Sequence, residues 1–332
     1  MTASTPQPGG WAALKSRLQQ NTARRIIYIF LILAGGAFIA YTLYANWNEF
    51  KSQAWSFNYR YILLAILIYP AGMLPTVAGW HNLLQSMGAK RPFRTNLRLY
   101  SLSSLPRHIP GFVLFVTSRG LLYQEQGIPT AITVTATGAE IILLALTGFI
   151  ISLSLLLLGS EATQGLGALR LVAPLAILVL LGLVLWTPGL NRLLNRLLAR
   201  HGGASLPQLD QKKILHTLAW MFVAWAGGGL ILCVLTQAIQ PVSWSLLPVF
   251  IGMWGAAGAV SLTIAIGIQG LGIRENTLGA LLSTILSPLV AIVIAVAFRL
   301  ALTASEILWV LLFIWLTRDE AGQKKKEQPE SG

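Results

Sequence analysis

Seven charged residues lie inside long apolar stretches of this 332-residue chain, where a membrane helix would place them deep in the bilayer. They are Arg107, Arg119, Glu140, Arg274, Glu275, Arg299 and Glu306. Inserting a charge at bilayer depth costs about 2.5–3.5 kcal/mol, so such residues are functional candidates by default. Arginine binds phosphate and carboxylate groups through a planar fork of donors. The residue types therefore predict an anion-binding site within the membrane, with the carboxylates as internal counter-charges.

Two of the arginines, Arg119 and Arg274, each follow a break in a helical stretch. The residues that make these breaks are Pro110, Gly111, Gly270 and Gly272. A break exposes the free N–H groups of the next half-helix and the positive end of its dipole. An arginine beside such an end concentrates positive potential, so we expect a phosphate site at the breaks. The alternative is that these arginines pair only with Glu140 or Glu275 and hold no ligand.

Glu140 lies at mid-depth of its predicted span, on one helix face with three threonines. These are Thr133, Thr137 and Thr147. A polar stripe of this kind lines a cavity or meets another polar helix. We predict that Arg119 and Arg274 share one central cavity, with Glu140 and Arg299 close by. Because adjacent residues on a helix do not face each other, Arg274 and Glu275 should have different partners.

The elements that carry these residues are membrane helices. Hydrophobic residues make up 55% of the chain and charged residues only 11%, against about 25% charged in soluble domains. The apolar runs are continuous and do not alternate, which excludes a membrane β-barrel. We therefore predict an all-α polytopic membrane protein, in which residues 25–318 form one transmembrane domain. A basic cytoplasmic leader (1–24) precedes this domain, and a disordered cytoplasmic tail (319–332) follows it.

Six full spans and two broken re-entrant segments are predicted. The full spans are 26–45, 61–86, 130–158, 169–187, 213–239 and 288–317. The broken segments, 93–122 and 243–286, are too polar in the middle to face lipid, and irregular backbone survives at this depth only inside protein or a water-filled cavity. The alternative has eight spans, with 243–268 crossing fully and 276–298 and 303–317 as separate spans.

The basic residues orient these spans. The formal net charge is +13, and seventeen Lys and Arg lie on one predicted side against three on the other. This distribution is typical of cytoplasmic loops and predicts that both termini are cytoplasmic in an inner membrane, with no nucleic-acid partner. Residues 190–201 place leucines opposite arginines at four-residue spacing, so this segment should lie on the inner membrane surface.

The two halves of the chain repeat the same pattern with opposite orientation. Two spans, a broken segment and a long span occupy 26–158, and the same order occupies 169–317. Paired interrupted segments in corresponding halves are the best indication from sequence of a transporter-type site. We therefore predict an inverted repeat whose two breaks meet.

These motifs resemble the transmembrane region of the lysylphosphatidylglycerol synthase/flippase family. The resemblance rests on Pro110-Gly111, Arg119, Gly127 and Glu140 in the first half, and on 268–275 and Arg299 in the second. The second break departs from the family pattern at Ile268 and Gln269, where a Pro and a Gly are usual. The resemblance implies a flippase-like integral membrane domain without the soluble synthase domain, and hence without aminoacyl transfer.

The favoured hypothesis is a bacterial inner-membrane lipid translocase for an anionic or polyprenyl-phosphate lipid. No P-loop pattern is present, so transport would be facilitated or ion-coupled, and no cofactor or metal is expected. The alternative is a non-transporting membrane subunit that presents lipid to a glycosyltransferase or synthase partner. An enzyme is not expected, although Glu140 or Glu275 could serve as a base in an intramembrane lipid enzyme. The predicted substrate-binding residues are Arg119, Arg274, Glu140, Glu275, Arg299, Pro110, Gly111, Gly270, Gly272 and Thr137.

Overall fold

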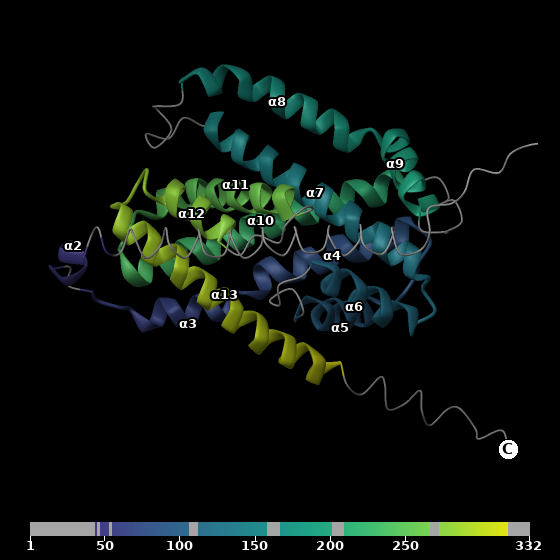
Figure 1. Ribbon diagram of the computed structural model, residues 1–332, viewed down its shortest axis with the longest axis horizontal. Coiled ribbons are helices and arrows are strands. Elements are labelled where there is room, and N and C mark those ends of the chain that lie inside the picture. Colours follow the sequence, from purple (N-terminus) through teal and green to yellow (C-terminus); the bar gives the residue numbers. More distant parts are fainter. Residues whose placement is uncertain are drawn as a thin grey trace, which may run out of the picture.

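The computed structural model describes residue 44 and residues 47–52, 55–105, 112–157, 167–200, 209–265 and 272–317. Every regular element in these ranges is helical, and Figure 1 shows their arrangement. The elements are α2 (Trp47–Ser52), α3 (Tyr59–Leu67), α4 (Pro70–Ser86), α5 (Phe93–Ser104), α6 (Phe112–Gln124), α7 (Thr130–Leu157), α8 (Gly167–Leu185), α9 (Thr187–Arg200), α10 (Gln211–Ile239), η3 (Trp244–Leu246), α11 (Leu247–Ala265), α12 (Ile273–Leu282) and α13 (Pro288–Leu316).

Some predicted features lie outside the described residues. They are the leader 1–24, the span 26–45 apart from residue 44, the tail 319–332, the charged residue Arg107, and the break residues Pro110, Gly111 and Gly270.

Five segments of the described chain are long and apolar enough to cross a membrane. They are Tyr59–Ser86, Thr130–Leu155, Gln211–Ile239, Trp244–Ile264 and Pro288–Leu316. A sixth is possible if 172–183 and 188–196, which meet at a bend of 64°, form one span. Leucines on α8 such as Leu175 and Leu178 are about two-thirds exposed, as expected of a helix whose outer face contacts lipid. The chain is a multi-span helical membrane protein.

The first predicted broken segment is a pair of short helices. At 1.5 Å per residue, α5 and α6 are each only about 18–20 Å long, whereas the hydrocarbon core is about 30 Å thick. The two helices pack against each other. Neither can cross the bilayer, so this part of the chain has the form predicted for a re-entrant segment.

The second broken segment differs from the first. Its first arm, η3 and α11, is long enough to cross because no charge interrupts the apolar run from Leu246 to Ala265. Its second arm, α12, has ten residues and ends at Leu282. The next helix, α13, starts at Pro288, where the Ser287 side chain accepts a hydrogen bond from the Val290 N–H, and continues to Leu316. The eight-span division of this region into 276–298 and 303–317 is therefore wrong, although its crossing over 243–268 matches the length of α11.

Helix contacts follow the order of the predicted inverted repeat, in which α4 to α7 correspond to α10 to α13. The packing of α5 on α6 has a counterpart in α11 on α12, and α6 on α7 in α12 on α13. The contact of α7 with α11 corresponds to that of α13 with α5, and α4 packs on α10. These pairings are those that the predicted repeat would give, whereas the packing of α7 on α10 has no comparable counterpart between α13 and α4 among the described helices.

The contact between α4 and α10 depends on small residues. The N–H of Gly228 lies 3.5 Å from the position of a Cβ added to Gly72, and a Cβ added to Gly227 would lie 2.2 Å from the carbonyl oxygen of Ala71. Near the other end, the Thr217 hydroxyl donates to the carbonyl of Gly79. Such close backbone approach is the usual means of helix association in a membrane, where lipid is as apolar as leucine.

The Gly227 contact gives a testable prediction. Gly227→Ala should lower the melting temperature of the protein in detergent, because its methyl group collides with backbone and overpacking costs about 1–3 kcal/mol. Gly182→Ala, on α8, is the matched control, since its Cβ would meet nothing within 4 Å. Equal melting temperatures for the two variants would show that the α4–α10 contact is looser than described.

Candidate functional site

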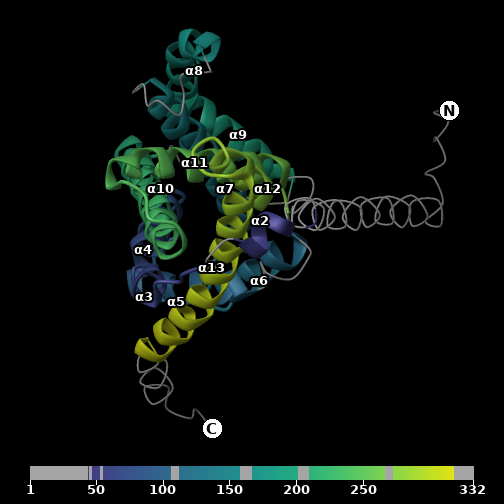
Figure 2. The same cartoon turned by 90° about the vertical axis from the view of Figure 1, so that its left-hand side faces the viewer.

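A cavity of about 270 Å³ lies among the membrane helices. Residues of α4, α5, α7, α10, α11, α12 and α13 line it, and Figure 2 shows α4 and α10 on one side of this region and α13 on the other. Its polar lining comprises Thr76, Tyr100, Ser261, Arg274, Arg299, Thr303 and Glu306. Both halves of the repeat therefore contribute to one cavity.

Two arginines of the cavity share one carboxylate. Glu275 Oε1 lies 3.2 Å from Arg299 Nη1 and 3.4 Å from Arg274 Nη2. The side chains of the two arginines are 25% and 27% exposed, whereas that of Glu275 is 9% exposed. The guanidinium groups thus border the open space of the cavity, and the more buried Glu275 carboxylate forms an ion pair with both of them.

The start of α12 explains where Glu275 lies. Gly272 precedes the helix with φ of 99°, a left-handed conformation that favours glycine. Its N–H donates to Glu275 Oε2 at 3.0 Å. Burial raises the pKa of the Glu275 carboxyl, but Arg274, Arg299 and this N–H outweigh burial and hold the pKa below its usual range. The Glu275 side chain already occupies the positive end of the helix.

A second ion pair is fully enclosed. Arg119 Nη1, on α6, donates to Glu140 Oε2, on α7, at 2.5 Å, and their side chains are 0% and 3% exposed. Arg119 Nε donates to Ser103 Oγ at 3.1 Å. Arg119 Nη2 has no acceptor among the described residues.

Three aromatic rings surround the Arg119 guanidinium. Its Cζ lies 4.4 Å from the ring centre of Trp80, 4.3 Å from that of Tyr100 and 4.5 Å from that of Phe115. Cation–π contacts of this kind are worth about 2 kcal/mol when they are desolvated. They help to compensate the burial of the charge, so Arg119 is stable without contact to water.

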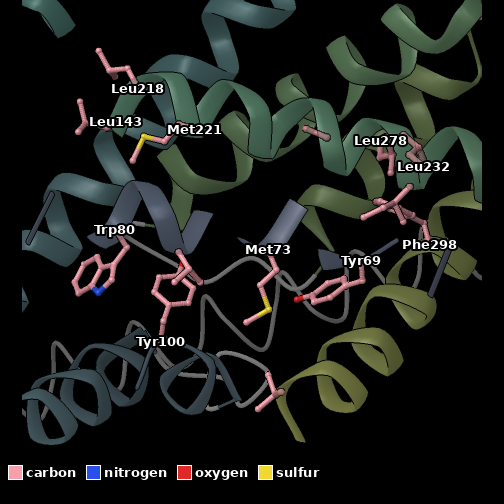
Figure 3. Packing of buried hydrophobic residues seen from close by; sticks show 14 of the residues in the cluster. Tyr69, Met73, Trp80, Tyr100, Leu143, Leu218, Met221, Leu232, Leu278 and Phe298 are labelled. Atoms are coloured by element: carbon pink, nitrogen blue, oxygen red, sulfur yellow. The ribbon is translucent and has the colours of Figure 1, made fainter. Parts of the chain in front are cut away.

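Tyr100 contacts both the cavity and the enclosed pair of Arg119 and Glu140. Its side chain lines the cavity, its hydroxyl donates to Glu140 Oε1 at 2.9 Å, and its ring packs under Arg119. Figure 3 shows the Tyr100 ring next to Trp80 and Met73, below α4. Tyr100 thus forms the boundary between the cavity and the enclosed pair.

The prediction of one shared cavity for Arg119 and Arg274 is wrong in one respect. Arg274 and Arg299 line the cavity, but Arg119 and Glu140 do not, because aromatic side chains from α4, α5 and α6 close around them. Thr137 is also buried away from the cavity, and its hydroxyl donates to the carbonyl of Thr133.

The expectation of different partners for Arg274 and Glu275 is also wrong. Glu275 turns back toward the start of α12 to accept from Gly272, and this brings its carboxylate within reach of Arg274.

Sequence reasoning missed the aromatic residues of the cavity, which include Tyr69, and left Glu306 out of the predicted binding residues. Tyr100, Trp225 and Trp254 line the cavity, and Arg274 Cζ lies 5.2 Å from the Trp254 ring centre. Glu306 shares a helix face with Arg299, a signal that was present in the sequence, and is 5% exposed. Aromatic residues are common in membrane helices, so their type alone gives no signal. Within the described ranges, no group of three or more His, Cys, Asp or Glu could hold a metal ion.

The enclosed pair gives a second prediction. Arg119→Ala leaves Glu140 as a buried unpaired charge and should destabilise the protein by about 3–5 kcal/mol. Arg119→Ala combined with Glu140→Ala should recover much of this loss, because no charge then remains. Thermal unfolding in detergent measures both variants, with Arg299→Ala, whose side chain is partly exposed, as the milder control. Additive losses in the double variant would contradict the pairing.

Comparison with known proteins identifies the family. Residues 26–309 match the model of the family described as the lysylphosphatidylglycerol synthase TM region. A search of curated proteins and a search of solved structures gave no match. The match spans most of the chain and covers the cavity, the cluster of Glu275 with its arginines, and the enclosed pair. The chain is a membrane lipid-related protein that belongs to the lysylphosphatidylglycerol synthase transmembrane family.

Proposed function

We propose that this protein moves a phosphate-bearing lipid across the bacterial inner membrane, with the phosphate held by Arg274 and Arg299. The supporting observation is a cavity among membrane-length helices that two partly exposed guanidinium groups line, both of them in contact with the carboxylate of Glu275. Glu306 lines the same cavity, so an anion is indicated by the partly exposed donors of the two arginines and not by an excess of positive charge. Guanidinium forks bind phosphate oxygens in two-point geometry.

The remainder of the cavity suits the apolar part of a lipid. Met73, Ile231 and Leu302 line it together with the rings of Trp225 and Trp254. A free inorganic anion would gain nothing from this apolar lining, whereas the glycerol and first methylenes of a lipid gain about 0.8 kcal/mol per buried CH2. The lining therefore favours a lipid as the carrier of the phosphate.

Exposed basic residues support the proposed orientation. Arg94 at the start of α5, and Arg192 and Arg196 on α9, are exposed. A basic segment near the membrane surface gains about 1 kcal/mol per residue from anionic lipid on the cytoplasmic side. We place this end of the protein, and both termini, in the cytoplasm.

Flipping in proteoliposomes tests the proposed function. Purified protein should accelerate the exchange of fluorescent phosphatidylglycerol or a fluorescent polyprenyl phosphate between leaflets, measured by quenching of the outer leaflet with dithionite. Arg274→Ala and Arg299→Ala should each slow exchange about tenfold to a hundredfold, since a hydrogen bond to a charged group is worth about 1.5–3 kcal/mol. Arg→Lys should restore exchange only in part, because the two-point geometry is lost.

The matched control is Arg192→Ala, which removes an exposed arginine of α9. Exchange at the rate of protein-free liposomes for both lipids would refute translocation. If the chain instead co-purified with a glycosyltransferase whose activity required it, the presenting role would replace the proposed one.

A further inference from the structure

The two halves of the repeat place an Arg–Glu pair at the same topological position. In the first half, the pair joins short helix α6 to long helix α7 through Arg119 and Glu140. In the second half, it joins short helix α12 to long helix α13 through Glu275 and Arg299. In the first pair the arginine lies on the short helix and the glutamate on the long helix, and in the second pair this order is reversed. Both pairs connect the short helix that follows a break to the next long helix.

The equivalent pairs differ in exposure. The α6–α7 pair is 0% and 3% exposed, whereas Arg299 of the α12–α13 pair is 27% exposed and lines the cavity. In inverted-repeat transporters, the two halves exchange conformations during transport. In one state of such a cycle, Arg299 would be exposed to the cavity and Arg119 would be buried, as they are here. In the other state, Arg119 would be exposed.

Arg119 has the properties of a ligand-binding group. It is fully buried, and its Nη2 has no acceptor among the described residues. A buried donor without an acceptor is destabilising, and more so when the donor is charged. A phosphate oxygen is the kind of acceptor that satisfies a guanidinium N–H.

Tyr100 is placed to control access to Arg119. Its ring covers the guanidinium at 4.3 Å, its hydroxyl donates to Glu140, and the same side chain lines the cavity. One rotation of this side chain would break the hydrogen bond to Glu140 and remove the ring from between Arg119 and the cavity.

We propose that Arg119 forms a second phosphate site, which opens to the cavity when Tyr100 turns away. On the proposed function, which this inference extends, the lipid phosphate passes from Arg274 and Arg299 to Arg119 rather than binding all three at once. Tyr100 is the positioning residue that keeps the second site closed until the transfer.

Cysteine labelling tests the second site without requiring transport. The sequence has one cysteine, Cys233, so Cys233→Ala gives a cysteine-free background. Ser103→Cys reports on the Arg119 site, because Ser103 Oγ accepts from Arg119 Nε. Thr303→Cys is the control in the cavity, and Thr236→Cys, which is buried on α10, is the control for general unfolding. The reagent is sulfonatoethyl methanethiosulfonate, whose negative charge suits an arginine site.

With Tyr100 intact, Thr303→Cys should react much faster than Ser103→Cys. Tyr100→Ala should accelerate labelling of Ser103→Cys about tenfold or more, corresponding to about 1.4 kcal/mol. Thr236→Cys should stay unreactive. Tyr100→Phe, which keeps the ring and loses the hydroxyl, should give an intermediate rate. Unchanged labelling of Ser103→Cys in a Tyr100→Ala protein that elutes as a single species would overturn the proposal.

Protection by ligand identifies what the second site binds. In the Tyr100→Ala background, phosphatidylglycerol in mixed micelles should slow labelling of Ser103→Cys, and inorganic phosphate should do so more weakly. Protection should disappear when Arg119→Gln and Glu140→Gln are combined, a change that removes both charges and keeps the shape. Labelling without protection would overturn the phosphate assignment. If the protein flips lipid but Ser103→Cys is never labelled, the second site is refuted and the proposed function is not. If Ser103→Cys is labelled and protected by ligand but the protein does not flip lipid, only the proposed function is refuted.

Discussion

A charge at membrane depth must have a counter-charge, and the structure of this protein follows from how its arginines meet that requirement. Arg119 and Glu140 neutralise each other inside a closed aromatic shell. Arg274 and Arg299 share Glu275 beside open space, in a cavity that Glu306 also lines. The same constraint thus gives an enclosed pair in one half and a candidate binding site in the other. The difference arises from packing, because α6 is covered by rings from α4 and α5, whereas α12 faces the cavity.

The cavity exists because the helices around it approach closely elsewhere. Gly148 on α7 and Gly255 on α11 lie against each other's backbone, and the Ser152 hydroxyl donates to the carbonyl of Gly252. Trp225 and Trp254 pack edge to face, and Trp254 packs in the same way against Phe298. The rings of Trp225 and Trp254 keep the helices apart beside the cavity, whereas the glycines of α7 and α11 let those two helices approach closely.

Much of the fold could be predicted from the sequence, because long apolar runs and polar breaks follow directly from the cost of burying charge in lipid. The spans beginning at Tyr59, Thr130, Gln211 and Pro288 lie close to their predicted positions. The first arm of the second broken segment was predicted to be re-entrant because of the polar residues at 269–275, whereas η3 and α11 together are long enough to cross the membrane. The inverted repeat stays a prediction, because α7 packs on α10 without a comparable contact of α13 with α4 among the described helices.

The candidate site was predictable only in part. Composition indicated which charges need partners, but three arginines and three acids allow several pairings, and the sequence does not fix which helix faces which. The separation of Arg119 from Arg274 depends on Tyr100, an aromatic residue on a third helix. No pattern in the sequence distinguishes such a ring from one that faces lipid.

The glycine contact between α4 and α10 has a consequence for motion. These helices pack closely, and in the predicted repeat they correspond to each other. Gly72, Gly227 and Gly228 bring no side chains that interlock across it. Packed helices that slide by small shear movements must otherwise release one set of side-chain contacts and form another. At the level of these glycines, a change in the angle between α4 and α10 would release few side-chain contacts, so this crossing is the place where the two helices could pivot.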